Sequence, residues 1–119
     1  MTERWVFVEG TNEMYEISDR GNTRSWFNGR WGRLTEPRLL KPGARKGTTP
    51  YLIVALTMPN GKMKTHYVHL LVAKHFLPPK PSPKHEIGHG NGNSFDNDYR
   101  NLSWVTRKEN EAEKRQRLR

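Results

Sequence analysis

The segment HEIGHGNGNSFDNDYRNLSWVTRKEN, residues 85–110, decides the fold that this sequence predicts. Its opening residues suit a short strand that ends at His89, and GNGNSFDND, residues 90–98, has the turn-forming composition of a polar loop. NLSWVT, residues 101–106, suits a second short strand. The segment therefore predicts two strands joined by a loop that is rich in Asn, Asp and Gly.

A helix is expected directly after the second strand. Thr106 and Glu109 fit a capping box, in which each side chain bonds the backbone amide of the other residue, and this predicts a helix from about Arg107 to Arg117. The order strand, loop, strand, helix places His89 on a strand and Asn110 in the first turns of the helix. Such an arrangement can hold one divalent metal ion between strand and helix, beside a histidine base.

The chain before this segment predicts a β-rich region. Strand patterns occur, in order, at residues 5–8, 14–18, 23–26, 51–58 and 63–68. In the second of them, Tyr15 and Ile17 alternate with Glu16 and Ser18, which is the period of a half-buried strand. Residues 28–50 are rich in Gly, Pro and Arg, which indicates a loop or a ragged hairpin.

The pattern then changes from strand to helix. Val68, Leu71, Val72 and Phe76 recur at steps of three and four residues, which predicts a short helix over HLLVAKHF. His69 stands at the start of this helix, where we expect it to cap or to pack. Several prolines follow closely, and they indicate a linker because proline cannot continue a helix.

Composition narrows the class of protein. The chain has 119 residues, of which 33% are hydrophobic, and a mean hydropathy of −0.97, which suits one compact domain or two small modules that share a thin core. It has no Cys, which excludes disulfides, thiolate catalysis and Cys-ligated zinc. No run of about 18 apolar residues occurs and the N-terminal stretch lacks a secretion signal, so we expect neither a membrane span nor a signal peptide.

The positive charge is concentrated in one stretch. The net charge is +9 at pH 7. Residues 1–19 hold five acids and one base, whereas residues 20–46 hold eight bases and one acid, interleaved with Trp26, Phe27 and Trp31. A balance of this size indicates a polyanionic partner, most often nucleic acid. The alternative is a solvated basic surface that keeps the protein soluble.

Residues 85–110 resemble the HNH nuclease family. The ββα-metal motif of that family has a His on its first strand, an Asn in the middle and a His or Asn on its helix, and the matching residues here are His89, Asn101 and Asn110. VHLLVAKHF resembles the helix that precedes the motif in phage and intron homing endonucleases. WVFVEGTNEMYEISDRGNTRSW, residues 5–26, resembles the small β-rich nuclease-associated modular domain at the N-terminus of those enzymes.

The resemblance implies an α+β protein with an antiparallel N-terminal sheet and a C-terminal ββα-metal unit. It implies a β-rich, DNA-contacting module at residues 1–62 and an HNH nuclease module at residues 63–119. The implied activity is hydrolysis of DNA phosphodiester bonds by an endonuclease of the homing or free-standing phage type. The implied partner is double-stranded DNA, and a monomer is the favoured state. The implied location is the cytoplasm of a bacterial host cell, if a phage encodes the chain.

The resemblance also assigns roles to single residues. His89 would be the general base that takes a proton from the attacking water. Asn101 would hold the loop between the strands, and with it the base, through hydrogen bonds to backbone. Asn110 would bind one divalent ion, with Mg²⁺ expected first and Mn²⁺ as the alternative, because an amide oxygen suits a hard cation.

One position departs from the family. The residue before the base is a metal ligand in many members, often Asp or His, and here it is Gly88, which has no side chain. Glu86 lies two residues earlier on the same face of the strand, and we expect it to reach the ion. Asp96 or Asp98 in the loop is expected to help. Otherwise Asn110, water molecules and the DNA phosphate itself would hold the ion. The departure also supports a second hypothesis, a DNA-binding protein with a degenerate, weakly active or inactive HNH site.

Basic residues across the chain are expected to contact DNA. They are Arg24, Arg30, Arg33, Arg38, Lys41, Arg45, Lys46, Arg107 and Lys108. Strands can enter a groove, and Arg can read the edges of guanine. A third hypothesis, a basic protein that binds RNA or the ribosome, leaves the pattern of His89, Asn101 and Asn110 unexplained.

Overall fold

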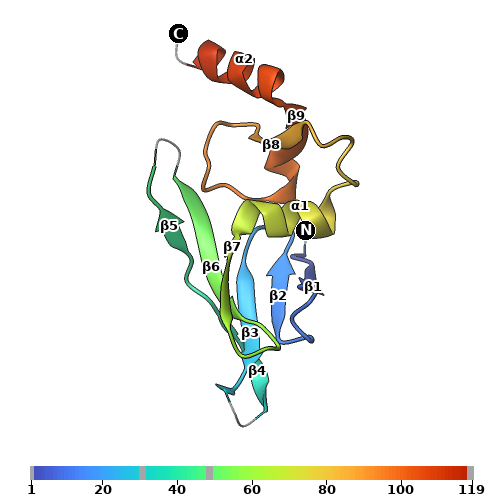
Figure 1. The fold of residues 1–119 in the computed structure, drawn as a ribbon, viewed down its shortest axis with the longest axis vertical. Helices are drawn as coiled ribbons and strands as arrows, with labels where there is room; N and C mark the ends of the chain where they lie inside the picture. Colours follow the sequence, from blue (N-terminus) through green and yellow to red (C-terminus); the bar gives the residue numbers. More distant parts are fainter. Residues whose placement is uncertain (1, 30–31, 48–49, 118–119) are drawn as a thin grey trace.

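The fold is elongated, with the sheets toward one end and a helix at the other (Figure 1). The computed structural model describes residues 2–29, 32–47 and 50–117, and its principal extents are 53 × 30 × 27 Å. All strand pairs are antiparallel and a few helices accompany them, so the expected α+β class is confirmed. In the described part of the chain, no helix has the length and apolar surface that crossing a membrane requires.

The first sheet is a four-stranded antiparallel meander. It consists of β1 (Trp5–Phe7), β2 (Tyr15–Ser18), β3 (Thr23–Phe27) and β4 (Arg33–Leu39), which pair in this order. The first three match the strands that the sequence predicts.

β2 is buried on both faces, which corrects the half-buried strand expected from Tyr15 and Ile17. Glu16 is tolerated in this strand because its carboxylate accepts hydrogen bonds from Arg24 Nε, at 2.8 Å, and from Trp26 Nε1. Burial acts to raise the pKa of Glu16, but the bonds from Arg24 and Trp26 outweigh it, so the pKa is lowered. The alternation of polar and apolar residues in β2 therefore reflects a buried Glu16 carboxylate that forms an ion pair with Arg24, and not a face exposed to solvent.

The second sheet consists of β5 (Gly43–Arg45), β6 (Tyr51–Thr57) and β7 (Met63–Tyr67), with β6 in the centre. Residues 28–50, expected as a loop or ragged hairpin, thus include β4 and β5, each at the edge of its sheet. The predicted module boundary, between residues 62 and 63, falls in the turn that joins β6 to β7. The division into two modules stays a prediction.

α1 (Val68–Phe76) lies at the centre of the core, between the sheets and the C-terminal unit (Figure 1). Its residues Val68 and Val72 are fully buried in one apolar cluster that also includes Ile17 of β2 and Leu56 of β6. The helix predicted from its apolar spacing is confirmed. Because the cluster draws on both sheets and on α1, the helix fixes the C-terminal unit to the strands.

The C-terminal unit has the predicted order of strand, loop, strand and helix. β8 (His85–His89) pairs antiparallel with β9 (Leu102–Thr106). A short 3₁₀ turn, η2 (Tyr99–Asn101), precedes β9, and α2 (Arg107–Arg117) follows it.

The start of α2 is fixed by the predicted capping box. Glu109 N donates to Thr106 Oγ1 at 3.2 Å, and Thr106 N donates to Glu109 Oε1 at 3.1 Å. The bond from the Thr106 backbone is the main reason that the pKa of Glu109 lies below its usual value. This start sets the position of Asn110, which is the next residue and is buried.

Candidate active site

His89 ends β8 inside the protein. Its side chain is buried, and its Nε2 lies 2.9 Å from Oδ1 of Asn97, in hydrogen-bond contact. The imidazole packs beside the rings of His69 and Tyr51, at centroid distances of 5.7 and 6.2 Å. The strand position predicted for His89 is confirmed, and its ring has a defined set of neighbours.

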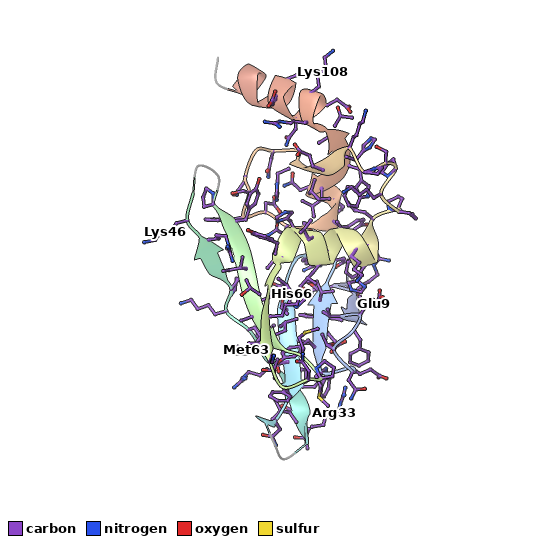
Figure 2. All side chains as sticks on the ribbon, in the orientation of Figure 1. Glu9, Arg33, Lys46, Met63, His66 and Lys108 are labelled. Carbon is purple, nitrogen blue, oxygen red and sulfur yellow. The ribbon has the colours of Figure 1, made fainter. Side chains whose placement is uncertain are left out.

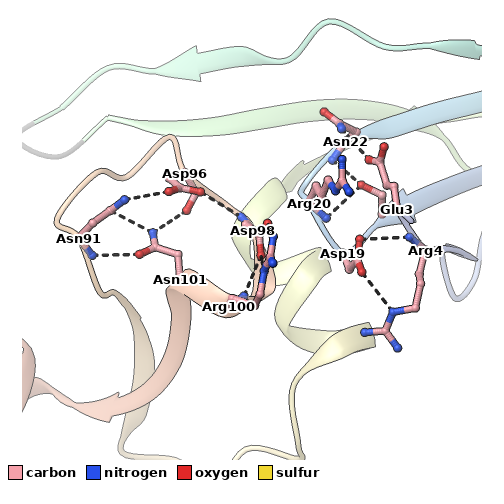
Figure 3. Close-up of polar contacts among 11 residues, drawn as sticks. Glu3, Arg4, Asp19, Arg20, Asn22, Asn91, Asp96, Asp98, Arg100 and Asn101 are labelled. Atoms are coloured by element: carbon pink, nitrogen blue, oxygen red, sulfur yellow. Dashed lines mark hydrogen bonds and ion pairs between the residues drawn. The ribbon is translucent and has the colours of Figure 1, made fainter. Parts of the chain in front are cut away.

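Asn101 ties the loop together through hydrogen bonds (Figure 3). Its Oδ1 accepts from the backbone N–H of Asn91 at 2.9 Å, and its Nδ2 donates to the backbone carbonyl of Asp96 at 2.9 Å. The Gly90 amide also donates to the backbone carbonyl of Asn101, at 2.8 Å. The residues just after His89 are therefore fastened to the residue before β9, by the bonds to backbone that we expect of Asn101.

Asn110 faces β8 from the first turn of α2. Its Nδ2 donates to Glu86 Oε1 at 2.9 Å. Because a carboxylate only accepts, Glu86 selects the amide nitrogen and leaves Asn110 Oδ1 turned away from it. A Cβ placed on Gly88 would lie 3.8 Å from this oxygen. Asn110 Oδ1 therefore approaches β8 at the residue just before the candidate base, while the His89 side chain, as the next residue of the strand, extends from the opposite face.

The donors around Gly88 suit a hard divalent cation. The amide oxygen of Asn110 and the carboxylate of Glu86 are oxygen ligands, the kind that Mg²⁺ prefers. Because Glu86 Oε1 accepts from Asn110 Nδ2 in this structure, sharing one ion with Asn110 Oδ1 requires Glu86 to use its other oxygen or to release this bond. The described residues contain no group of three or more His, Asp or Glu side chains arranged to hold a metal ion. Water molecules and phosphate oxygens of a substrate would complete the coordination of an ion bound at this place.

The loop carboxylates expected as further ligands have other partners (Figure 3). Asp98 accepts from the Arg100 backbone amide at 3.0 Å and pairs with its guanidinium at 2.7 Å. The side-chain bond to Arg100 is the main cause of the lowered pKa of Asp98. Asp96 Oδ2 accepts from Asn91 Nδ2 at 2.8 Å. Both carboxylates hold the shape of the loop, and Glu86 is the carboxylate that touches Asn110.

Gly88 has little room for a side chain. An added Cβ would lie 3.0 Å from Cγ2 and 3.4 Å from Cγ1 of Val105, which is buried on the neighbouring strand. Contacts this short require the neighbour to move. The isopropyl group of Val105 thus fills the space into which a side chain at position 88 would extend.

An open cavity of about 590 Å³ borders these donors. Its wall includes Tyr51, Tyr67, His69, Glu86, Arg107 and Asn110. His89 is not part of this wall, but its ring packs beside two wall residues, Tyr51 and His69. A polar wall that carries a guanidinium and an amide oxygen suits a phosphate group with a bound cation.

His69 packs in the cavity wall and does not cap α1. The helix starts without a side-chain cap, and the His69 ring centroid lies 4.7 Å from that of Tyr51 and 5.5 Å from that of Tyr67. Burial, and after it the charge of His89, lowers the pKa of His69 to about 4. Of the two roles expected for His69, packing is confirmed and capping is wrong, and the ring is neutral at pH 7.

The comparison with protein families identifies this unit. The sequence model of the HNH endonuclease family matches residues 66–112, a range that includes His89, Asn101 and Asn110. Residues 66–112 are therefore similar to an HNH endonuclease domain. The resemblance predicted from the sequence is thereby confirmed.

Two relatives extend the similarity beyond the HNH domain. An uncharacterised HNH endonuclease of Acanthamoeba polyphaga mimivirus is 38% identical over 96 residues, which are 81% of this chain and 25% of that protein. A solved structure on DNA binding and cleavage by the HNH homing endonuclease I-HmuI is 30% identical, with a TM-score of 0.72. It covers 96% of this chain and 59% of the I-HmuI chain. This chain therefore spans a quarter of one relative and less than two thirds of the other.

The bases expected to contact DNA fall into two groups, and the HNH domain contributes to both. In one group each guanidinium has a neighbour in the chain: Arg24 with Glu16, Arg33 with the Glu13 carbonyl, Arg45 over the Tyr67 ring, and Arg107 with Glu111. The other described bases of this set are Arg38, Lys41, Lys46 and Lys108, which are exposed, as are Arg33, Arg45 and Arg107 of the first group. Figure 2 shows Arg33, Lys46 and Lys108 at well-separated points along the molecule. Arg30 lies outside the described residues.

Two residues beside the HNH motif were not expected. Asn97 touches His89, but in the sequence it is one Asn among several in a polar loop, and no spacing distinguishes it. The contact of Val105 with Gly88 could have been found from the sequence. Antiparallel pairing of the two predicted strands puts Val105 diagonally across from Gly88 on the same face.

Proposed function

We propose that this chain is an HNH-type endonuclease that hydrolyses phosphodiester bonds of double-stranded DNA. The observation that carries the proposal is the order of residues at the end of β8: a buried histidine, His89, directly follows Gly88, the position that Asn110 Oδ1 approaches from α2. A base and an oxygen ligand in this arrangement suit the attack of water on a phosphate. The similarity to I-HmuI, whose structure concerns DNA binding and cleavage, supports DNA as the substrate.

In this mechanism His89 is the general base that accepts a proton from the attacking water. Asn110 and Glu86 would hold one divalent ion, Mg²⁺ first and Mn²⁺ as the alternative. When bound, such an ion neutralises charge on the phosphate and on the leaving oxygen. Asn101 keeps the loop after His89 in place, and Arg107 adds positive charge to the cavity wall.

The exposed bases would follow the DNA backbone, because Lys and Arg release the counterions that condense on phosphates. Arg38, Lys41 and Lys46 belong to the strand region and Lys108 to α2, so the contact would run along the long axis (Figure 2). We place the chain with the homing or free-standing phage endonucleases, acting as a monomer in the cytoplasm of a bacterial host. The 30% identity to a homing endonuclease supports the homing type.

Nicking of supercoiled plasmid DNA tests the proposal. The protein should nick with Mg²⁺ and should stop when EDTA removes the ion. His89→Ala should lower the rate by about 10²–10⁴-fold, the usual contribution of a positioned general base, while DNA affinity is kept. His75→Ala is the matched control. His75 lies in the last turn of α1, where its Nε2 accepts a hydrogen bond from the Glu9 amide. Nicking by His89→Ala at the rate of the unchanged protein would sink the assignment.

A second candidate is a DNA-binding protein with a degenerate HNH site. It is favoured by Gly88, which offers no ligand, and by the lack of a three-ligand group in the described residues. This candidate predicts tight binding of duplex DNA without nicking in either Mg²⁺ or Mn²⁺. Tighter binding of RNA than of duplex DNA would contradict both candidates.

A further inference from the structure

Asn97 is a buried polar residue that the proposed mechanism does not use. It is 3% exposed, and its Oδ1 lies 2.9 Å from Nε2 of His89. Its amide nitrogen is also buried and has no hydrogen-bond partner within the described part of the chain. An orphaned buried donor costs about 1–3 kcal/mol. The Asn97 side chain therefore does not improve stability as an apolar residue would, so the presence of Asn at this position needs another explanation.

The hydrogen bond to His89 provides such a reason, because it fixes the tautomer of the ring. A carbonyl oxygen only accepts, so an Asn97 Oδ1 that faces Nε2 requires the proton of the neutral imidazole to be on Nε2. The lone pair is then on Nδ1, and Nδ1 is the atom that takes a proton from water. Asn97 thus determines which nitrogen of His89 is basic and where the ring points.

Asn97 is in turn held by residues 19–22, the turn that joins β2 to β3. Tyr99 N donates to the Asp19 carbonyl at 2.8 Å, which docks this turn on the loop. Gly21 has a φ of +86°, and a Cβ placed on it would lie 2.8 Å from Asn97 Cβ and 3.1 Å from the Asn97 carbonyl oxygen. Glycine is required at this position both by the backbone conformation and by the approach to Asn97.

The turn is itself anchored to the first sheet (Figure 3). Asp19 is buried and accepts from Arg4 N at 3.2 Å and from Arg4 Nε at 3.1 Å. Burial acts to raise the pKa of Asp19, but the bonds from Arg4 outweigh it and lower the pKa. The Gly21 amide donates to the Ser18 carbonyl at 3.0 Å. A turn tied at these points is a firm support for the loop.

We infer that Asn97 is a positioning residue for His89, and that the turn of residues 19–22 locks Asn97 in place from the N-terminal sheet. The inference rests on the proposed function, in which His89 is the base. On this inference, the loop of residues 90–98 holds His89 in place only after the first sheet has docked against it.

NMR of the histidine rings in the free protein tests whether Asn97 positions His89. The protein is labelled with ¹⁵N-histidine, long-range ¹H–¹⁵N spectra are recorded near pH ~8, where imidazole is neutral, and His89 is assigned from His89→Gln. The unchanged protein should show a proton on Nε2 that exchanges slowly with water. Asn97→Ala should lose this slow proton, and Asn97→Asp, which keeps an acceptor, should retain it. A proton on Nδ1, or a slow ring proton that survives in Asn97→Ala, would overturn the inference.

Two glycine variants test whether the turn of residues 19–22 holds Asn97 in place. Gly21→Ala should displace Asn97 and remove the slow His89 proton. Gly10→Ala is the matched control, because Gly10 has a φ of +83° but no atom within 4 Å of its added Cβ. The backbone strain is similar in the two variants and only Gly21 touches Asn97. Equal spectra of His89 in the two variants would contradict the role of the turn.

Plasmid nicking separates this inference from the proposed function. Asn97→Ala should lower kcat at least tenfold, by less than His89→Ala does, and leave KM for DNA unchanged, with partial recovery in Asn97→Asp. A protein that nicks equally well with and without Asn97 refutes the inference and keeps the nuclease. A protein that never nicks, but whose His89 spectra behave as described, refutes the nuclease and keeps the positioning of His89 by Asn97.

Discussion

At the scale of the residue, Gly88 is limited by its neighbour and not by its backbone. It is not among the glycines with positive φ, so its side-chain space is limited by Val105, whose Cγ2 would lie 3.0 Å from an added Cβ, and only loosely by Asn110 Oδ1 at 3.8 Å. Gly88→Asp should therefore fold poorly, whereas Gly88→Asp with Val105→Ala should fold and bring a carboxylate toward Asn110. The double variant should need less Mg²⁺ for nicking, because a hard cation prefers carboxylate oxygen.

The single variant Val105→Ala is the control for this pair, and loss of a buried Val side chain should cost about 1–3 kcal/mol of unfolding free energy. Thermal melting separates this cost from the effect on the metal. A well-folded double variant with an unchanged Mg²⁺ requirement would mean that Glu86 already fills the ligand position.

His69 makes stability depend on pH. Its pKa is about 4 in the folded protein and near 6.5 when unperturbed. As the pH falls the unfolded chain binds this proton first, so the stabilisation is complete above pH ~6.5 and is lost progressively toward pH ~4. His69→Phe should reduce the loss of unfolding free energy between pH ~6.5 and pH ~4 by about 2 kcal/mol, a value that includes a discount for solvent screening. Urea unfolding at both ends of the window measures it, and an identical loss in the variant would contradict the burial of His69.

Residue positions in this site were predictable where the contact is local. His89, Asn101 and Asn110 were placed by the family pattern, and the bonds of Asn101 span one loop. The contacts of Asn97 and His69 depend on elements far away in the sequence, namely the turn of residues 19–22 and β6. No local pattern encodes such contacts, because they exist only once the core has formed.

At the scale of the element, the capping box governs where α2 begins and hence where Asn110 lies. Thr106→Ala removes the acceptor for the Glu109 amide and should cost about 1 kcal/mol of stability. It should also raise the Mg²⁺ concentration needed for nicking, because the first turn that carries Asn110 frays. Lys108→Ala, an exposed change in the same turn, is the control for stability. Equal melting temperatures of the two variants would show that tertiary packing, not the cap, holds this turn.

Elements were predictable in proportion to their local signals. The capping box indicated the start of α2 correctly, and the apolar spacing indicated α1. β4 was missed because it contains Pro37 and charged residues, which do not look like a strand. Pro is compatible with β4 because this strand lies at the edge of its sheet, where one side of the backbone needs no partner.

At the scale of the whole molecule, DNA affinity should depend on where the positive charge lies. The double variant Lys41→Ala, Lys46→Ala should weaken DNA binding and reduce the slope of log affinity against log salt by roughly 0.9 for each phosphate that is no longer neutralised. Lys62→Ala with Lys64→Ala removes the same charge from exposed positions outside the predicted surface. Fluorescence anisotropy over a salt series measures the slope. Equal decreases in affinity for the two double variants would mean that only net charge matters.

The arrangement of the whole molecule was harder to foresee than its class. The order of strands, helix and nuclease motif follows from patterns along the chain. One apolar cluster nevertheless includes Val8, Tyr15, Val54, Val72 and Leu102, which lie in or next to the two larger sheets, in α1 and in β9. Packing of this kind is set by the complementary shapes of distant surfaces, which a single sequence does not display.

The docking of the turn at residues 19–22 on the catalytic loop has a consequence for synthesis. The ribosome releases β2 and β3 well before the loop that carries Asn97, so the turn is made before the loop that it supports. A chain whose first strands misfold would contain the complete HNH sequence and yet leave His89 unlocked. On the proposed function, His89 would then be held for cutting DNA only after both regions are translated and folded.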